Sequence, residues 1–182
     1  MKIKKILGTL FFLLLAVVLV SCSNKTFEVV FYDWDNTVLD TQKVEEGSVA
    51  TAPKNPTREG YDFLGWNKEY TNITEDIEIT ATYQIKTFTV TWKNHDGSIL
   101  KIDENVEWGS TPSYGESTPT KAATAEFNYT FIGWSPTVEV ATSNQEYVAQ
   151  FSETIKTYTV IWKNHDGSVL ETDQVAYGEV PT

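Results

Sequence analysis

The sequence has little cysteine and few basic residues. Its 182 residues include one cysteine, so no disulfide can form within the chain and no zinc site can be built from several cysteines. Lys and Arg number 14 against 25 Asp and Glu. The resulting formal net charge of −11 argues against nucleic-acid binding, which needs cations to neutralise phosphates. With 41% hydrophobic and 13% aromatic residues, however, the chain is too apolar to be wholly disordered.

Long apolar runs are also missing, except near the N-terminus. Residues 6–20 form a mostly apolar run that is shorter than the roughly 20 residues a membrane-spanning helix needs. Three lysines precede it: Lys2, Lys4 and Lys5. A basic start, a short apolar stretch and small residues after it predict a secretory signal over residues 1–21 rather than a part of the fold.

The end of this signal reads Leu19-Val20-Ser21-Cys22 and resembles the lipobox of bacterial lipoproteins. The resemblance implies cleavage before Cys22 and attachment of diacylglycerol to its sulfur. An ordinary signal peptide with a chance cysteine is the alternative. Stable anchoring needs more than one acyl chain, which such lipoproteins carry. We therefore expect an exported cell-envelope lipoprotein that faces the extracellular side and meets the membrane through its N-terminal lipid. Removing the signal deletes three lysines and no acids, which takes the formal charge from −11 to −14.

The rest of the chain repeats itself, which is the primary clue to its organisation. The segments 86–100 (KTFTVTWKNHDGSIL) and 156–170 (KTYTVIWKNHDGSVL) are identical at 12 of 15 positions, and a diverged copy covers residues 25–39. We predict four parts: a lipoprotein signal peptide at 1–21, repeat module 1 at 22–85, repeat module 2 at 86–155, and an incomplete third repeat at 156–182. The third stops early, so we expect this chain to be cut from a longer gene product.

The repeats predict mainly β-structure. Apolar side chains alternate in Phe88–Trp92, as in a half-buried strand, and Asp96-Gly97 is typical of a tight hairpin turn. Asp166-Gly167 occupies the same position in the third copy. No stretch has a long helical period, although Lys121–Glu126 is rich enough in alanine for one or two helical turns. The second copy carries an insertion after Lys121, which we expect in a loop.

One segment is specific enough to name a family. Residues 56–66 read PTREGYDFLGW, and residues 129–134, YTFIGW, keep the end of the same motif. This resembles the Listeria–Bacteroides repeat, also called the internalin-type B repeat. The resemblance implies small β-grasp-like modules in tandem, a mainly β (β-rich α+β) fold class, and no catalytic residues. It also implies a surface protein that acts as a spacer or an adhesion array. Its partner would be an unidentified surface or host protein or a glycan, and we expect no enzyme activity and no cofactor.

An enzymatic alternative rests on Asp33-Trp34-Asp35-Asn36-Thr37, which follows an apolar strand. It resembles the first motif of haloacid-dehalogenase-type phosphatases, in which Asp33 would be the nucleophile and Asp35 the acid, beside a magnesium ion. The internal repeat argues against this interpretation, because Asp33 aligns with Asn94 and Asn164. The sequence also lacks the helices of the α/β sheet that such an enzyme needs. We therefore expect no catalytic residues.

Metal sites are equally unsupported. The two histidines, His95 and His165, occupy the same turn position in two repeats, and each has only one aspartate beside it. A metal site needs several converging ligands. The acidic turn 33–40 lacks the glycine and the distant glutamate of a calcium loop. We therefore expect no metal.

Six tryptophans raise the possibility of sugar binding, because sugar rings stack on exposed aromatic faces. Four of them recur at repeat positions, so we predict that they belong to the core: Trp66, Trp92, Trp134 and Trp162. Trp34 and Trp108 do not recur in the other copies. These two are the candidate ligand contacts, and a carbohydrate-binding surface module is the alternative function.

Overall fold

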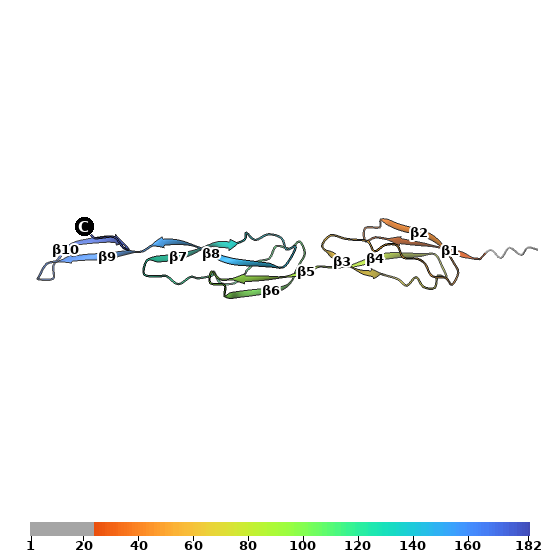
Figure 1. Ribbon diagram of the computed structural model, residues 1–182, viewed down its shortest axis with the longest axis horizontal. Helices are drawn as coiled ribbons and strands as arrows, with labels where there is room; N and C mark the ends of the chain where they lie inside the picture. Colours follow the sequence, from red (N-terminus) through yellow and green to blue (C-terminus); the bar gives the residue numbers. More distant parts are fainter. Residues whose placement is uncertain (1–23) are drawn as a thin grey trace, which may run out of the picture.

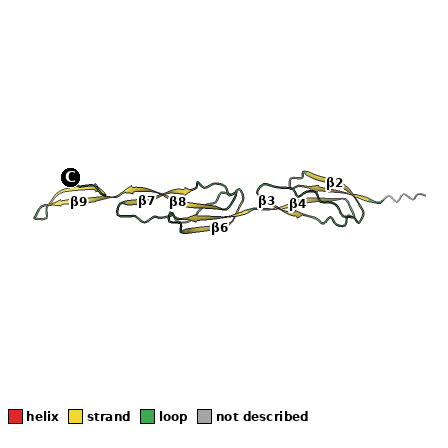
Figure 2. Ribbon diagram, in the orientation of Figure 1, coloured by secondary structure: helices red, strands yellow, loops and turns green. Residues whose placement is uncertain are grey.

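The computed structural model describes residues 24–182, and every regular element in that range is a β-strand (Figure 2). The predicted signal segment and Cys22 lie outside the described residues. Between residues 24 and 182 no helix is present that is long and apolar enough to cross a membrane. The strands form three sheets that follow one another along the long axis of Figure 1.

The first sheet has the strand order of a β-grasp module. Its strands are β1 (Thr26–Tyr32), β2 (Val38–Glu45), β3 (Tyr61–Trp66) and β4 (Ile77–Ile85), in the order β2-β1-β4-β3. The central pair, β1 and β4, is parallel, and both edge strands are antiparallel to their neighbours. The connection from β2 to β3, residues 46–60, is irregular. The predicted β-grasp-like sheet is confirmed, without a helical component in this range.

The second sheet repeats this topology. Its strands are β5 (Thr87–Lys93), β6 (Ile99–Glu107), β7 (Phe127–Ser135) and β8 (Gln145–Ile155), in the order β6-β5-β8-β7. The sequence insertion lies partly inside β7, where Phe127 pairs with Ile155 and lengthens the β7–β8 ladder. Only its first part is a loop, so the loop prediction is partly wrong. Residues 121–126 are irregular, and the short helix expected there is absent because the segment leads directly into β7.

The third sheet is a hairpin of β9 (Thr157–Lys163) and β10 (Val169–Ala176). The prediction that Trp162 belongs to the core is wrong, since this side chain keeps 43% of its surface exposed. Its repeat equivalent Trp92 is 1% exposed, because β8 and the end of β7 cover it. Trp162 has no such cover among the described residues, so the repeat position alone does not determine burial.

Aromatic residues fill the two closed cores. Phe31 and Trp92 occupy the same repeat position and are 0% and 1% exposed. Around Trp92, the ring centroids of Tyr147 and Trp134 lie 4.9 and 4.8 Å away, and Trp66 lies 4.9 Å from Phe31. Such ring pairs stabilise the core beyond the contribution of the large apolar area that each aromatic side chain buries. This explains how units of this size form cores without disulfides.

The hairpin turns differ in detail from the expected two-residue turn. Gly97 takes a φ of 84°, whereas Asp96 has no positive φ. Asp96 instead accepts hydrogen bonds from the backbone N and the Oγ of Ser98, at 3.0 and 2.6 Å. Asp35 accepts from Thr37 N in the same way, and there Asn36 supplies the positive φ of 67°. A longer loop with one left-handed residue therefore closes these hairpins.

Candidate functional site

Both candidate tryptophans, Trp34 and Trp108, lie against one segment, residues 58–61, at the first joint between repeats. The guanidinium of Arg58 lies 4.0 Å from the ring centroid of Trp34 and 3.6 Å from that of Tyr61. Trp34 is 49% exposed and Trp108 is half-buried. The two residues identified from the sequence therefore contact the same short segment in the fold, although they are 74 positions apart in the chain.

The indole of Trp108 packs directly on Gly60. A Cβ atom at Gly60 would lie 2.2 Å from Cδ2 of Trp108, and Gly60 has a φ of 75°. Only glycine meets both conditions without strain, since a left-handed backbone is costly for other residues and here the side-chain space is already filled. The contact joins the end of the first repeat to the β6 end of the second.

Backbone hydrogen bonds complete this joint. Lys86 N donates to Gly60 O at 2.9 Å, and Trp108 N donates to Lys86 O at 2.8 Å. The second joint has the same pattern, in which Lys156 N donates to Glu126 O at 2.7 Å and Tyr177 N donates to Lys156 O at 2.9 Å. The joining lysine is therefore bonded on both sides at each joint. Periodicity does not reveal this arrangement, although Trp108 and Tyr177 hold equivalent positions, each directly before the glycine that follows the repeated hairpin (Gly109 and Gly178).

A basic side chain on an aromatic ring recurs in the second repeat. Lys121 Nζ lies 3.6 Å from the ring centroid of Tyr129, and His95 stacks edge-on against Phe151 at 5.5 Å. Trp34, Arg58 and Tyr61 hold the related positions in the first repeat. Sequence reasoning missed this cation–π contact, because Arg58 and Lys121 stand in irregular segments with no periodic signal. The recurrence indicates a structural role, which leaves one face of Trp34 occupied by Arg58.

The aspartates of the phosphatase-like motif are held by local structure. Asp33 Oδ1 accepts hydrogen bonds from Trp34 N at 2.8 Å and from the hydroxyl of Tyr83 at 2.7 Å. The hydrogen bonds that Asp35 accepts from Thr37 lower the pKa of the Asp35 carboxyl below its usual value. The α/β framework of such enzymes is absent from residues 24–182. This geometry is that of a hairpin turn, in which both carboxylates already serve as acceptors.

Tyr83 gives a measurable signature of this turn. Burial, the hydrogen bond to Asp33 and the Asp33 charge raise the pKa of the Tyr83 hydroxyl to about 12. We expect Asp33→Asn to lower this pKa, because the amide oxygen can still accept the hydrogen bond while the charge is lost. The value should stay above 10, since burial is the largest cause. The phenolate signal of Tyr83 in a pH titration followed by NMR measures the change.

The same variant has a consequence for stability. A raised folded-state pKa contributes stability that is complete below the unfolded value near 10 and is lost as the pH rises through about 12. Asp33→Asn should therefore lose less stability than the parent chain over this interval. Asp35→Asn is the comparison variant, because its side chain bonds Thr37 rather than Tyr83 and its charge is the smallest of the causes that raise the Tyr83 pKa, so it should lower that pKa less than Asp33→Asn does. An unchanged Tyr83 titration in Asp33→Asn would contradict the assigned contact.

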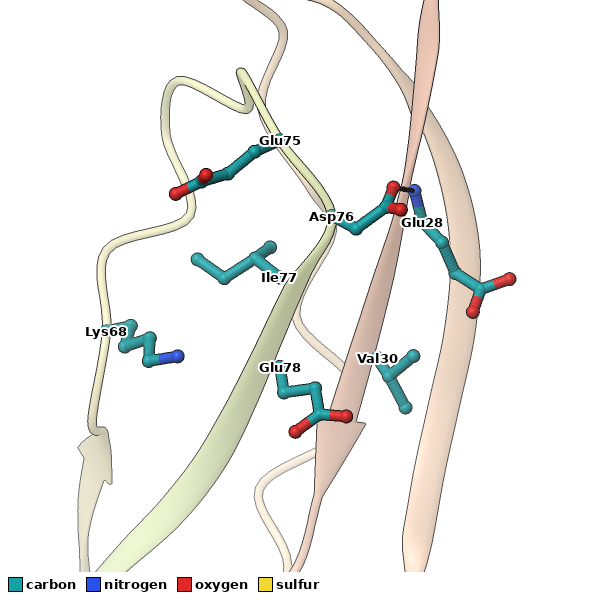
Figure 3. A pocket seen from close by; sticks show the side chains of 7 residues that line it. All are labelled: Glu28, Val30, Lys68, Glu75, Asp76, Ile77 and Glu78. Carbon is teal, nitrogen blue, oxygen red and sulfur yellow. Dashed lines mark hydrogen bonds between the residues drawn. The ribbon is translucent and has the colours of Figure 1, made fainter.

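A hollow lies beside β1 and the start of β4 (Figure 3), and neither Trp34 nor Trp108 lines it. It has a volume of about 490 Å³ and is lined mainly by charged side chains, including Glu28, Lys68, Glu75, Asp76 and Glu78. Asp76 Oδ1 accepts a hydrogen bond from Glu28 N at 2.8 Å, so this carboxylate fixes the strand pair. No three His, Cys, Asp or Glu side chains within residues 24–182 are grouped so that they could hold a metal ion.

Comparison with known proteins identifies the repeat. Residues 27–87 match the sequence model of the Listeria-Bacteroides repeat domain, which confirms the resemblance for the first repeat. A protein of Evansella cellulosilytica, whose name assigns it provisionally to membranes, is 24% identical over 156 residues. That match covers 76% of this chain and 22% of the relative, so the chain spans about a fifth of the relative's length.

A solved structure of tandem surface domains also aligns with the chain. It contains domains 3–4 of the Streptococcal High Identity Repeats in Tandem (SHIRT) from a cell surface protein. The alignment covers 71% of this chain and 99% of that one, with 17% identity and a TM-score of 0.33.

Proposed function

We propose, on the premise that residues 27–87 form a Listeria–Bacteroides repeat domain, that the chain is a lipid-anchored bacterial cell-envelope protein. Its repeats act as a spacer or adhesion array that faces the extracellular side. The partner is a surface protein, a host protein or a glycan. The family is one of bacterial surface repeats, and the lipobox ending at Cys22 supports the anchor.

The joints between sheets support the spacer role. Strand β4 ends at Ile85 and β5 begins at Thr87, while β8 ends at Ile155 and β9 begins at Thr157. Each connection is one lysine, and both of its backbone polar groups are hydrogen-bonded. A flexible spacer would need a longer connection, because chain flexibility comes from free backbone dihedrals. Repeats joined in this way hold their neighbours at a defined distance, which is the property a spacer needs.

The lipid anchor is tested at Cys22. In a bacterial host fed labelled palmitate, the full chain should incorporate label and sediment with membranes. Cys22→Ala should abolish both signals, because the chain has no second cysteine to accept the lipid. Ser21→Ala is the matched control, since it keeps a small residue at the cleavage site and leaves the acceptor sulfur in place. Label retained in Cys22→Ala would overturn the anchor.

Carbohydrate binding is the second candidate function, and the exposure of Trp34 is the observation that favours it. Binding on a glycan array that disappears in Trp34→Ala would support it. Trp162→Ala is the control, because Trp162 is comparably exposed but lies on a different repeat. Loss in both variants would indicate nonspecific stacking on exposed indoles, and absence of any glycan signal would leave the spacer role alone.

A further inference from the structure

Arg58 is the only arginine in the chain, and it has no acidic partner among residues 24–182. Its guanidinium lies over the rings of Trp34 and Tyr61, 4.0 and 3.6 Å from their centroids. Every ion pair in this range is made by a lysine instead. Arg58 also donates no side-chain hydrogen bond there, and because no side-chain nitrogen without a partner is buried, its N–H groups contact solvent. The first joint therefore presents an accessible, unpaired guanidinium.

The equivalent cation of the second repeat is paired with an acid. Lys121 and Arg58 each follow a Pro-Thr pair in their repeats. Lys121 Nζ lies 3.6 Å from the ring centroid of Tyr129, and the same nitrogen lies 3.7 Å from Glu153 Oε1. The second repeat thus surrounds its cation with an aromatic ring and a carboxylate. The first repeat provides aromatic rings alone.

The strand register explains why this acid is missing from the first repeat. Tyr129 pairs with Glu153 across β7 and β8, and Tyr61 pairs with Ile85 across β3 and β4. The two pairs are equivalent, because each joins the tyrosine of the repeated motif to the facing position of the next strand. An apolar side chain therefore stands where the second repeat supplies its carboxylate, which leaves Arg58 able to bind a carboxylate from another molecule.

An exposed indole lies beside this cation. Trp34 is 49% exposed, whereas the second repeat has His95 at this turn position, which lacks the broad apolar face of an indole. The neighbouring carboxylate of Asp33 is already bonded to Trp34 N and to the hydroxyl of Tyr83, at 2.8 and 2.7 Å. Of the two closed repeats, only the first combines an open stacking surface with an unpaired guanidinium.

We propose that Trp34 and Arg58 form a binding site for an acidic oligosaccharide of the uronic-acid class. One sugar ring stacks on the open face of Trp34. Because Arg58 covers the opposite face, the carboxylate comes from the neighbouring sugar unit and accepts two hydrogen bonds from the edge of the guanidinium. The planar fork of arginine matches a carboxylate in this way, while stacking on rings leaves its N–H donors available. This assignment rests on the carbohydrate-binding candidate above and adds the chemical class of its ligand.

The test is an NMR titration of residues 22–182, the expected mature chain, with Cys22→Ser. The probes are trigalacturonate and its methyl ester, which have the same sugar rings but differ in charge. The indole Nε1 signal of Trp34 reports stacking, and the Nε signal of Arg58 is unambiguous because the chain has one arginine. We expect trigalacturonate to shift both signals and to bind about tenfold more tightly than the ester, because a charge-assisted bidentate contact adds to the stacking.

Two variants at Ile85 test the missing acid directly. Ile85→Glu places a carboxylate opposite Tyr61, as in the second repeat, so it should pair with Arg58 and remove the preference for the acidic probe. Ile85→Gln is the matched control, because it has a similar size without the charge and should keep the preference. The indole signal of the buried Trp92 should stay unchanged in both variants, which verifies that the chain is folded.

The outcomes distinguish this assignment from carbohydrate binding in general. Trp34→Ala should weaken the binding of both probes. Equal affinity for the acid and the ester, lost in Trp34→Ala, would overturn the assignment and leave carbohydrate binding in place. A preference for the acid that survives in Ile85→Glu would overturn it as well. Binding of neither probe would also overturn it, while the glycan array decides separately on the carbohydrate candidate.

Discussion

Replacing Trp92 by alanine is expected to destabilise the second repeat by about 3–5 kcal/mol, the usual cost of removing a buried tryptophan. Trp92 is 1% exposed and packs against Tyr147, Trp134 and Tyr114. Its loss leaves a cavity at the centre of a small core and removes the hydrogen bond to Asp103. The effect should be confined to this repeat, because Trp92 has no contact with the core around Phe31.

Trp162→Ala is the matched control for this prediction. It removes the same side chain at the same repeat position, and it also removes the equivalent hydrogen bond, to Asp173. Because 43% of the Trp162 side chain is already exposed, we expect a clearly smaller loss of stability than in Trp92→Ala. Hydrogen exchange resolves the two sheets separately, which a single melting curve of a multi-repeat chain does not. Comparable losses of protection in the two variants would contradict the burial difference.

Gly60→Ala is expected to disrupt the first joint while both neighbouring sheets remain folded. The new methyl group would overlap the indole of Trp108, whose Cδ2 lies 2.2 Å from its position. The backbone adds a further cost of about 1–2 kcal/mol, since alanine is unfavourable in the left-handed region. We expect faster exchange of the Lys86 and Trp108 amides and altered residual dipolar couplings between the first and second sheets.

Two variants separate the overlap from the backbone cost. Gly97 has a similar φ of 84° but open space around it. Gly97→Ala therefore introduces only the unfavourable backbone conformation, without an overlap, and should leave the joint intact. Trp108→Ala removes the obstacle, so the double variant Gly60→Ala/Trp108→Ala should be less than additive. Additive effects, or an unchanged joint in Gly60→Ala, would show that the Trp108 contact does not fix the repeats.

The strands were predictable because their signal is local. The alternation in Phe88–Trp92 and the repeated turns led directly to β5, β6, β9 and β10, and a mainly β fold followed. Trp162 was placed in the core wrongly, because burial depends on strands distant in the chain rather than on its own segment. The helix expected at residues 121–126 failed for a related reason: alanine content is a weak preference that the neighbouring ladder overrides.

The candidate site was predictable only in part. Trp34 and Trp108 were identified because they break the repeat pattern, and the fold places both against residues 58–61. The reason for Gly60 was not visible, because its close contact comes from the following repeat. Arg58 was missed as well, since a single cation in an irregular segment has no spacing that marks it. Contacts between repeats therefore require the folded chain, even where each repeat can be read from its sequence.

The single-residue connections also determine how the chain responds to mechanical force. Because β1 and β4 are parallel neighbours, the start of β1 and the end of β4 lie at opposite ends of the first sheet. Tension transmitted through Lys86 then slides the two strands past each other and loads their hydrogen bonds together, instead of opening them one at a time. The second sheet has the same geometry between β5 and β8. A pull along the chain therefore loads the central strand pair of each closed repeat in shear. In this geometry the hydrogen bonds between the two strands must break together, so the sheet resists unfolding by force.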